Sequence, residues 1–360
     1  MGVLTKDARS RGQGLPGHPI EDARAIVSLN PSPPSMPASL AGIRYPSSRV
    51  LLPRTRLAYI HLRNLLSDAK RDRAARVSAY VAIWLPEELV TLYLRTGEVV
   101  NATVGDAAGS RAVAISEALE RVPAEPEYGE ICFHEAEPEQ LACMFAAQSL
   151  EPQPWPNDLA PSDATKLFPF LMSTVFDGAV EILADDTVNY LVFEGGTVAR
   201  AFLAAAHHGT LIDRVSKLFT REGRVGKIEL RRWPSPLSLP EQAPPRLIQA
   251  YRELSASLIR ALVERGRDSA PAIAEHARLN LIDKHPALDG FSTNGRVPCD
   301  PLCDSKALTT AVAAWIKDVM WTAADQDSDS AEELLRKLTW ERRHLFQSAG
   351  LFEKLPWKMT

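Results

Sequence analysis

The chain has 360 residues, 45% of them hydrophobic, so it is long and apolar enough for two or three packed domains. Its 41 basic and 45 acidic residues give a formal net charge of −4, which disfavours a nucleic-acid partner because phosphate binding requires clustered excess positive charge. Four cysteines are too few for a disulfide framework in a chain of this size, and no apolar run reaches the ~20 residues of a membrane span. We therefore expect a cytoplasmic protein without a membrane partner.

Two stretches of the chain have the composition of irregular segments. Residues 1–50 combine Gly, Pro, Ser and Arg with little hydrophobic periodicity, which predicts a disordered N-terminal segment. Residues 151–157 contain alternate prolines, which exclude a helix and interrupt strand pairing. We assign residues 151–162 to a linker between two folded units, at 51–150 and 163–265, and residues 266–360 to a helical C-terminal domain.

The same order of elements is predicted on each side of the linker. The first unit is read as a helix, three strands, a helix and a last strand at 60–70, 76–84, 89–94, 99–104, 110–121 and 130–134. In the second unit the corresponding elements lie at 164–174, 178–184, 188–193, 198–203, 210–220 and 226–231. Residues 92–102 match residues 191–201 at a constant offset, 191 − 92 = 99. The pattern predicts an internal repeat.

Glycines mark corresponding turns of the two units. Gly97 and Gly196 follow apolar strands at hairpin turns, where a positive φ costs glycine little, and Gly129 and Gly226 precede the last strand of each unit. A glycine followed by a hydroxyl residue, Gly109-Ser110 and Gly209-Thr210, predicts a capped helix start in each unit. We expect an α+β fold of two tandem, small antiparallel-sheet-plus-helix units followed by a helical bundle.

Beyond residue 245 the apolar residues recur at helical spacing. One stripe is formed by Leu247, Ile248, Tyr251, Leu254, Leu258 and Leu262. This stripe predicts one long helix that closes the second unit, and further helices are predicted at 271–285, 305–323 and 330–348. The C-terminal region therefore reads as a small bundle.

Two groups of residues are candidates for binding chemistry. Cys299, Cys303 and His285 form a weak candidate metal site, but a structural zinc site requires four ligands with paired short spacings, so an ordinary loop is favoured and no cofactor is expected. His207 and His208 lie before a predicted helix start, where they could titrate or bind an anion together with the helix amino terminus, and Arg200 is a further candidate ligand contact. The first unit has Ala107-Ala108 at the matching positions, so an exposed loop is favoured there too. No catalytic residues are assigned.

The repeated pattern resembles the bacterial PATAN domain, also known as DUF4388. The resemblance covers Thr165 to Arg232, and the positions that carry it are Gly178, Ile182, Phe193, Gly196, Val198, Ala201, Gly209, Gly226 and Ile228. A weaker copy covers residues 60–135, where Ser78 stands in place of Gly178. The resemblance implies a role in bacterial signalling or protein interaction, commonly in chains that also hold receiver domains. No receiver-domain pattern is present in this sequence.

The favoured hypothesis is a non-catalytic adaptor or sensor that acts through a protein partner. The alternative is a regulatory protein with a small-ligand pocket between the two repeats, to which Arg200, His207 and His208 would contribute. A third reading is a metal-dependent enzyme that uses His285, Cys299 and Cys303. The identity of the partner and the oligomeric state do not follow from the sequence.

Overall fold

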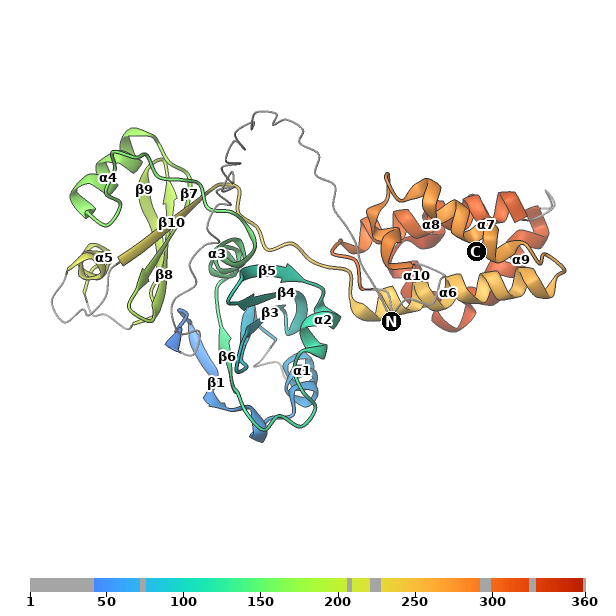
Figure 1. Ribbon diagram of the computed structural model, residues 1–360, viewed down its shortest axis with the longest axis horizontal. Helices are drawn as coiled ribbons and strands as arrows, with labels where there is room; N and C mark the ends of the chain where they lie inside the picture. The colour runs from blue at the N-terminus through green and yellow to red at the C-terminus, as the bar shows by residue number, and fades with distance from the viewer. Residues whose placement is uncertain are drawn as a thin grey trace, which may run out of the picture. The chain divides into compact units, whose positions relative to one another are not determined.

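A computed structural model describes residues 42–360 apart from 72–75, 206–208, 221–227, 292–298, 324–327 and 359–360. Within these residues the chain contains two antiparallel sheets together with helices (Figure 1). The α+β class expected from the sequence is therefore confirmed.

The larger sheet has six strands in the order β1-β6-β2-β3-β4-β5. In chain order these strands are β1 (Arg49–Arg56), β2 (Ala79–Trp84), β3 (Leu89–Arg95), β4 (Glu98–Asp106), β5 (Gly109–Val113) and β6 (Glu130–Glu135). Its helical elements are the 3-10 turn η2 (Leu57–Tyr59), α1 (Leu62–Arg71) and α2 (Ile115–Glu120). Every residue of β2 is buried, as expected for a strand whose two faces are both covered.

The smaller sheet has four strands in the order β10-β7-β8-β9. They are β7 (Gly178–Ala184), β8 (Thr187–Glu194), β9 (Thr197–Phe202) and β10 (Ile228–Pro234). Helices α4 (Ala164–Ser173) and α5 (Leu211–Phe219) lie on one side of this sheet (Figure 1). The Thr210 side chain accepts a hydrogen bond from the Asp213 backbone and thereby caps α5, as the sequence predicted.

A single offset relates the strand pairing of the two sheets. Ala79 faces Leu94 between β2 and β3, and Gly178 faces Phe193 between β7 and β8, so that 178 − 79 = 99 and 193 − 94 = 99. The same offset converts every β2–β6 pair into a β7–β10 pair. The bulges correspond as well: the register shifts between Tyr93 and Leu94 in the larger sheet and between Val192 and Phe193 in the smaller one, again 99 residues later.

The hairpin glycines share one structural role. Gly97 and Gly196 both have positive φ, and their amides donate to the carbonyl oxygens of Val77 and Phe176, each 20 residues earlier. A Cβ atom on Gly97 would lie 2.1 Å from the Ala69 carbonyl oxygen of α1, and one on Gly196 would lie 2.6 Å from the Leu171 carbonyl oxygen of α4. Each glycine therefore allows a helix to pack closely on its hairpin.

Helix α3 (Pro138–Ser149) was not predicted from the sequence. It contacts β4 and β5 of the larger sheet and β7 and β10 of the smaller one, and its residues from Gln140 to Gln148 are all buried. One core cluster joins this helix to both sheets and includes Tyr80, Tyr93, Phe145, Tyr190 and Trp233. The opposite faces of the two sheets pack on their own helices in separate clusters. The two sheets thus present corresponding faces to one shared core.

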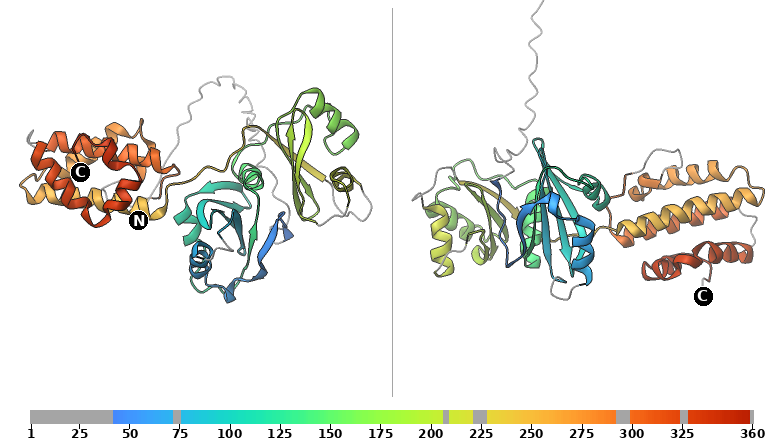
Figure 2. Two further views of the ribbon diagram at one scale, coloured as in Figure 1. Left: turned by 180° about the vertical axis from the view of Figure 1, so that it is seen from behind. Right: turned by 90° about the horizontal axis from the view of Figure 1, so that it is seen from below.

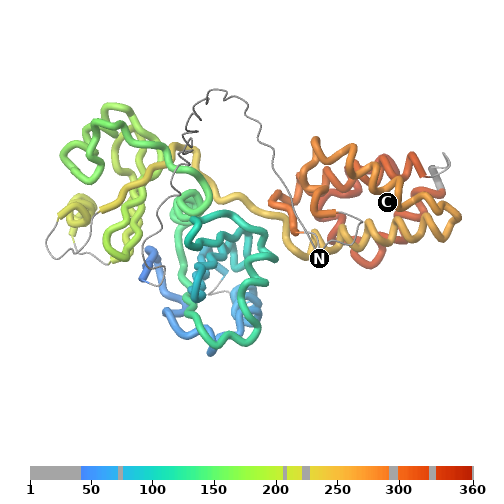
Figure 3. Tube along the Cα trace, viewed as in Figure 1, coloured from blue at the N-terminus to red at the C-terminus, as the bar shows by residue number. Residues whose placement is uncertain are grey.

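The C-terminal region is helical, as predicted. Figure 2 shows it from two further directions, and Figure 3 traces the chain from β10 into its first helix. Its elements are α6 (Pro245–Glu264), α7 (Ala270–Leu281), η3 (Pro286–Phe291), α8 (Ser305–Ala323), α9 (Ser328–Thr339), η4 (Trp340–Arg342), α10 (Arg343–Ser348) and α11 (Leu351–Lys354). The apolar stripe of α6 is buried in the same cluster as α8, so this helix packs with the C-terminal helices rather than with the second unit.

Several expected boundaries differ from the observed ones. The predicted helix at 110–121 is wrong at its start, because Gly109 to Val113 form β5 and Ser110 pairs with Gly105 in the sheet instead of capping a helix. The predicted disordered segment extends too far, since Ile43 is buried, Arg44 bridges to Thr187 and β1 begins at residue 49. The predicted helix at 330–348 is interrupted by η4. By register, the counterpart of Gly178 is Ala79 rather than Ser78.

Candidate functional site

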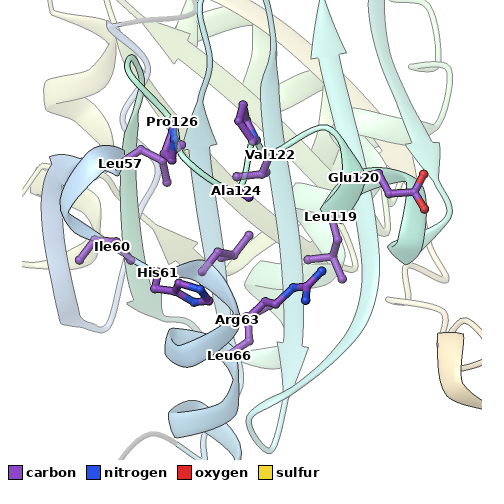
Figure 4. A pocket seen from close by; sticks show the side chains of 12 residues that line it. Leu57, Ile60, His61, Arg63, Leu66, Leu119, Glu120, Val122, Ala124 and Pro126 are labelled. Atoms are coloured by element: carbon purple, nitrogen blue, oxygen red, sulfur yellow. The ribbon is translucent and has the colours of Figure 1, made fainter.

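An apolar groove of about 500 Å³ lies on the helical side of the larger sheet (Figure 4). One wall is formed by η2 and α1, and the other by the end of α2 and the connection to β6. Its lining residues are Leu57, Ile60, His61, Leu62, Arg63, Leu66, Leu119, Glu120, Val122, Pro123, Ala124 and Pro126. Among them only His61, Arg63 and Glu120 carry ionisable side chains, and all three are exposed. The groove is therefore an apolar surface with charged groups at its mouth.

Local sequence explains both walls of the groove. Leu62, Leu65, Leu66 and Ala69 recur at helical spacing, so α1 turns one apolar face toward the cluster that contains Leu57. Pro123 and Pro126 restrict the opposite wall to non-helical backbone. Leu57 is only 1% exposed and belongs to the core beneath the groove, whereas Leu62, Leu66 and Val122 stay half-buried. Apolar surface therefore remains open to a partner.

A second candidate is a small polar crevice at the shared core. It measures about 30 Å³, and Tyr45, Gln148, Glu181, Tyr190 and Arg231 are among the residues that line it. Binding sites for metabolites usually measure ~300–1,000 Å³, so this crevice is too small for such a ligand. Its size suits water.

The crevice contains a buried ion pair. Arg231 Nη2 donates to both carboxylate oxygens of Glu181, at 2.9 and 2.8 Å, and Glu181 is only 4% exposed. Burial raises the pKa of Glu181 above its ordinary value, while the Arg231 guanidinium opposes that rise. At the corresponding positions the larger sheet carries Ala82 and Cys132.

A hydrogen-bonded chain of side chains leads from the larger sheet to the crevice. Thr103 Oγ1 donates to Gln148 Oε1 at 2.5 Å, and Gln148 Nε2 donates to Tyr45 Oη at 3.0 Å. Because the Thr103 hydrogen is engaged, Tyr93 Oη is the donor in its 3.3 Å contact with Thr103. The hydroxyl of Tyr190 is buried beside this chain, and it has no partner among the described residues.

The weak metal candidates lie around a third cavity, of about 730 Å³, in the C-terminal region. Cys299 is exposed and Cys303 is half-buried, where burial raises its thiol pKa to about 11. Burial and Lys284 lower the pKa of His285. Arg252 holds the loop by donating to Asp300 and to the Gly290 and Cys299 carbonyl oxygens. Among the described residues no three His, Cys, Asp or Glu side chains gather closely enough to hold a metal ion.

Arg200, one of the three predicted ligand-binding residues, does not line the polar crevice. Arg200 lies on β9, where it forms ion pairs with Glu137 and Glu139 beside the start of α3. His207 and His208 lie outside the described residues, as does Gly226. Gly97 and Gly196 both have positive φ at their hairpin turns, and Gly129 also has positive φ, with the Trp84 carbonyl oxygen 2.7 Å from where a Cβ would stand.

The residues of the groove and of the crevice were not selected from the sequence. Glu181 could have been noticed, because it is a single acidic residue inside the apolar strand 178–184. The groove gave no comparable signal, since Leu66 and Val122 are ordinary apolar residues that only the fold brings together.

Comparison with known proteins finds no matching family model, no matching characterised protein and no matching solved structure. Among the described residues, none of the helices combines the length and the apolar character needed to cross a membrane.

Proposed function

We propose that this chain is a non-catalytic adaptor or sensor of bacterial signalling that binds a helical segment of a partner protein. The observation that carries the proposal is the apolar groove beside α1, whose floor and walls are aliphatic and whose charged groups lie only at its mouth. Amphipathic helices dock in grooves of this kind through apolar residues spaced three and four apart.

The strand pairing supports the idea of two PATAN-like units. One offset of 99 residues relates the four strands β2, β3, β4 and β6 to β7, β8, β9 and β10, bulge included. Such agreement is what a tandem duplication would leave, and Gly196, one of the glycines of the resemblance, lies at the hairpin turn between β8 and β9. The C-terminal helices would then form an appended bundle.

The dimensions of the groove fit a short helix. Helix α1 has 10 residues, and at ~1.5 Å of rise per residue it offers a wall of roughly 15 Å. A partner helix of about three turns would match that length and place two or three apolar side chains against Leu62, Leu66 and Val122. At the mouth, Arg63 favours an acidic residue on one flank of the partner helix and Glu120 a basic residue on the other.

The proposal is tested by chemical cross-linking in the native cell, followed by capture of the chain. Leu66→Glu places a charge on the wall of the groove, and Arg63→Glu reverses a charge at its mouth without disturbing the core. Leu279→Glu, a matched substitution at an exposed position of α7, is the control. We expect a partner that is captured by wild type and by the control but lost with both groove variants. Equal capture of every partner by all four proteins would exclude the groove as the binding site.

The alternative of a small-ligand regulator rests on the polar crevice, where several polar side chains converge. Its volume of about 30 Å³ opposes that alternative. Thermal unfolding in the presence of a metabolite library checks it, since a ligand at 100 times its Kd would stabilise the chain by about 2.7 kcal/mol.

A further inference from the structure

The polar crevice combines features that together indicate a bound molecule. Its lining includes the Glu181–Arg231 ion pair and Tyr190, which belong to the smaller sheet. It also includes Tyr45, which lies just before strand β1 of the larger sheet. Tyr190 is 1% exposed, and its hydroxyl has no partner among the described residues. Buried hydroxyls without a partner are rare in folded proteins, because the hydrogen bond lost from water is then not replaced.

Tyr190 of β8 faces Glu181 of β7 across the two paired strands, and both residues line the crevice. Burial raises the pKa of Tyr190 well above the ordinary value, and the Glu181 carboxylate and the Tyr45 hydroxyl raise it further, while Arg231 opposes them. Residues directly opposite on paired strands lie side by side, yet the Tyr190 hydroxyl and the Glu181 carboxylate form no direct hydrogen bond. A gap between a donor and a carboxylate inside a lined cavity is the geometry that a bridging molecule fills.

The unused hydrogen-bonding capacity defines the occupant. Tyr45 Oη accepts from Gln148, and its own hydrogen has no acceptor among the described residues. Glu181 accepts two bonds from Arg231 and retains free lone pairs on both oxygens. The crevice thus offers two hydroxyl donors and one carboxylate acceptor. Water accepts two hydrogen bonds and donates two, so it satisfies all three groups.

We propose that this crevice is a binding site for one or two structural water molecules, which bridge the hydroxyls of Tyr190 and Tyr45 to the Glu181 carboxylate. The cavity of about 30 Å³ has the required size, because a water needs roughly 10–15 Å³ of space for its centre. A cation is a poorer occupant, since Arg231 already neutralises Glu181. The bound water joins the smaller sheet to the segment that enters the larger one.

A high-resolution crystal structure of the full chain tests the site directly. We expect a water oxygen within hydrogen-bonding distance of Tyr190 Oη and Glu181 in the wild-type protein, and its loss or displacement in Tyr190→Phe. A direct bond from Tyr190 to a protein atom, or an empty crevice in the wild-type protein, would overturn the proposal.

A double-mutant cycle in solution tests the same bridge independently of crystals. Tyr190→Phe and Glu181→Gln are expected to be non-additive, with a coupling of 3-fold or more in the unfolding equilibrium constant, at the lower end of couplings seen for groups in one network. Tyr80→Phe, which removes a hydroxyl elsewhere in the same core, should add to Glu181→Gln without coupling. If Glu181→Gln does not fold, Tyr45→Phe takes its place. Additive effects of Tyr190→Phe in the cycle would contradict a bridging water.

Discussion

The two sheets share one pattern of strand pairing, but a buried cross-strand pair that is apolar in the larger sheet is charged in the smaller one. In the larger sheet Ala82 faces Cys132, and at the corresponding positions of the smaller sheet Glu181 faces Arg231. The register, the bulge and the hairpin glycine are unchanged by this difference. Pairing is therefore fixed by the turns and by the close helix contacts at Gly97 and Gly196, whereas the shared core accepts either a small apolar pair or an ion pair.

Among the predictions, removal of one partner of the ion pair is expected to lower the free energy of unfolding the most. Arg231→Ala leaves the Glu181 carboxylate buried without its counter-ion, which typically costs 3–5 kcal/mol. We expect a loss of about 3 kcal/mol, the lower end of that range, because the Arg231 side chain is 33% exposed. Urea unfolding measures it.

The double variant Glu181→Ala/Arg231→Cys installs the apolar pair of the larger sheet. Replacement of a whole buried ion pair by apolar residues is often neutral, so this protein should be more stable than Arg231→Ala by about 2 kcal/mol. Equal stabilities of the double and single variants would mean that the two sheets do not tolerate the same pair.

Substitution of the hairpin glycines tests whether the turns fix the shared register. Gly97→Ala and Gly196→Ala each place a Cβ within 2.6 Å of a helix backbone at positive φ, and we expect about 2 kcal/mol or more of destabilisation from each. Gly195→Ala is the matched control, because it also has positive φ but no atom lies within 4 Å of its Cβ. Its cost should be about 1 kcal/mol. Comparable thermal unfolding of all three variants would argue against the helix contact as the constraint.

The smallest expected effect is a pH dependence of folding stability that arises from His134 in the larger sheet. Burial lowers the pKa of His134, and the register counterpart of His134 is Trp233, which does not titrate. Below the ordinary value of about 6.5 the unfolded chain binds a proton that the folded chain resists, so stability falls as the pH drops from there through the lowered pKa. His134→Gln should flatten the melting temperature measured between pH 7 and pH 5.

His285, whose pKa is also lowered, provides the control variant for the measurement of the melting temperature against pH. His285→Gln lies in the C-terminal helices and should leave the contribution of the larger sheet intact. A pH dependence that is the same in His134→Gln and in wild type would show that the burial of this imidazole has no consequence for stability.

The sequence predicted those elements whose signal is local. The hairpins at Gly97 and Gly196 and the apolar stripe of α6 were recognised because turn glycines and helical spacing can be read within a few residues. Helix α3 escaped recognition because it is buried on all sides and lacks an amphipathic pattern. Strand β5 was mistaken for a helix start because Gly109-Ser110 resembles the true cap at Gly209-Thr210.

The groove and the crevice could not be predicted from the sequence for a different reason. Leu57 and Val122 of the groove are separated by 65 residues, and Tyr45 and Tyr190 of the crevice by more than twice that distance. Apolar residues and tyrosines are common in cores, so nothing in their local context marks them as part of a site. Only the pairing of strands and the packing of α3 bring them together.

The short pairing at Arg44 has a consequence for the integrity of the whole α+β region. The Arg44 amide donates to the Asp186 carbonyl oxygen, and its carbonyl accepts from Val188, while the strand that begins five residues later joins the other sheet. Separation of the two halves after a cut within residues 151–162 would therefore remove the Arg44 pairing from the later half and uncover the rings of Tyr190 and Trp233. If the halves arose by gene duplication, they have since lost their independence, and proteolytic separation should melt both at once.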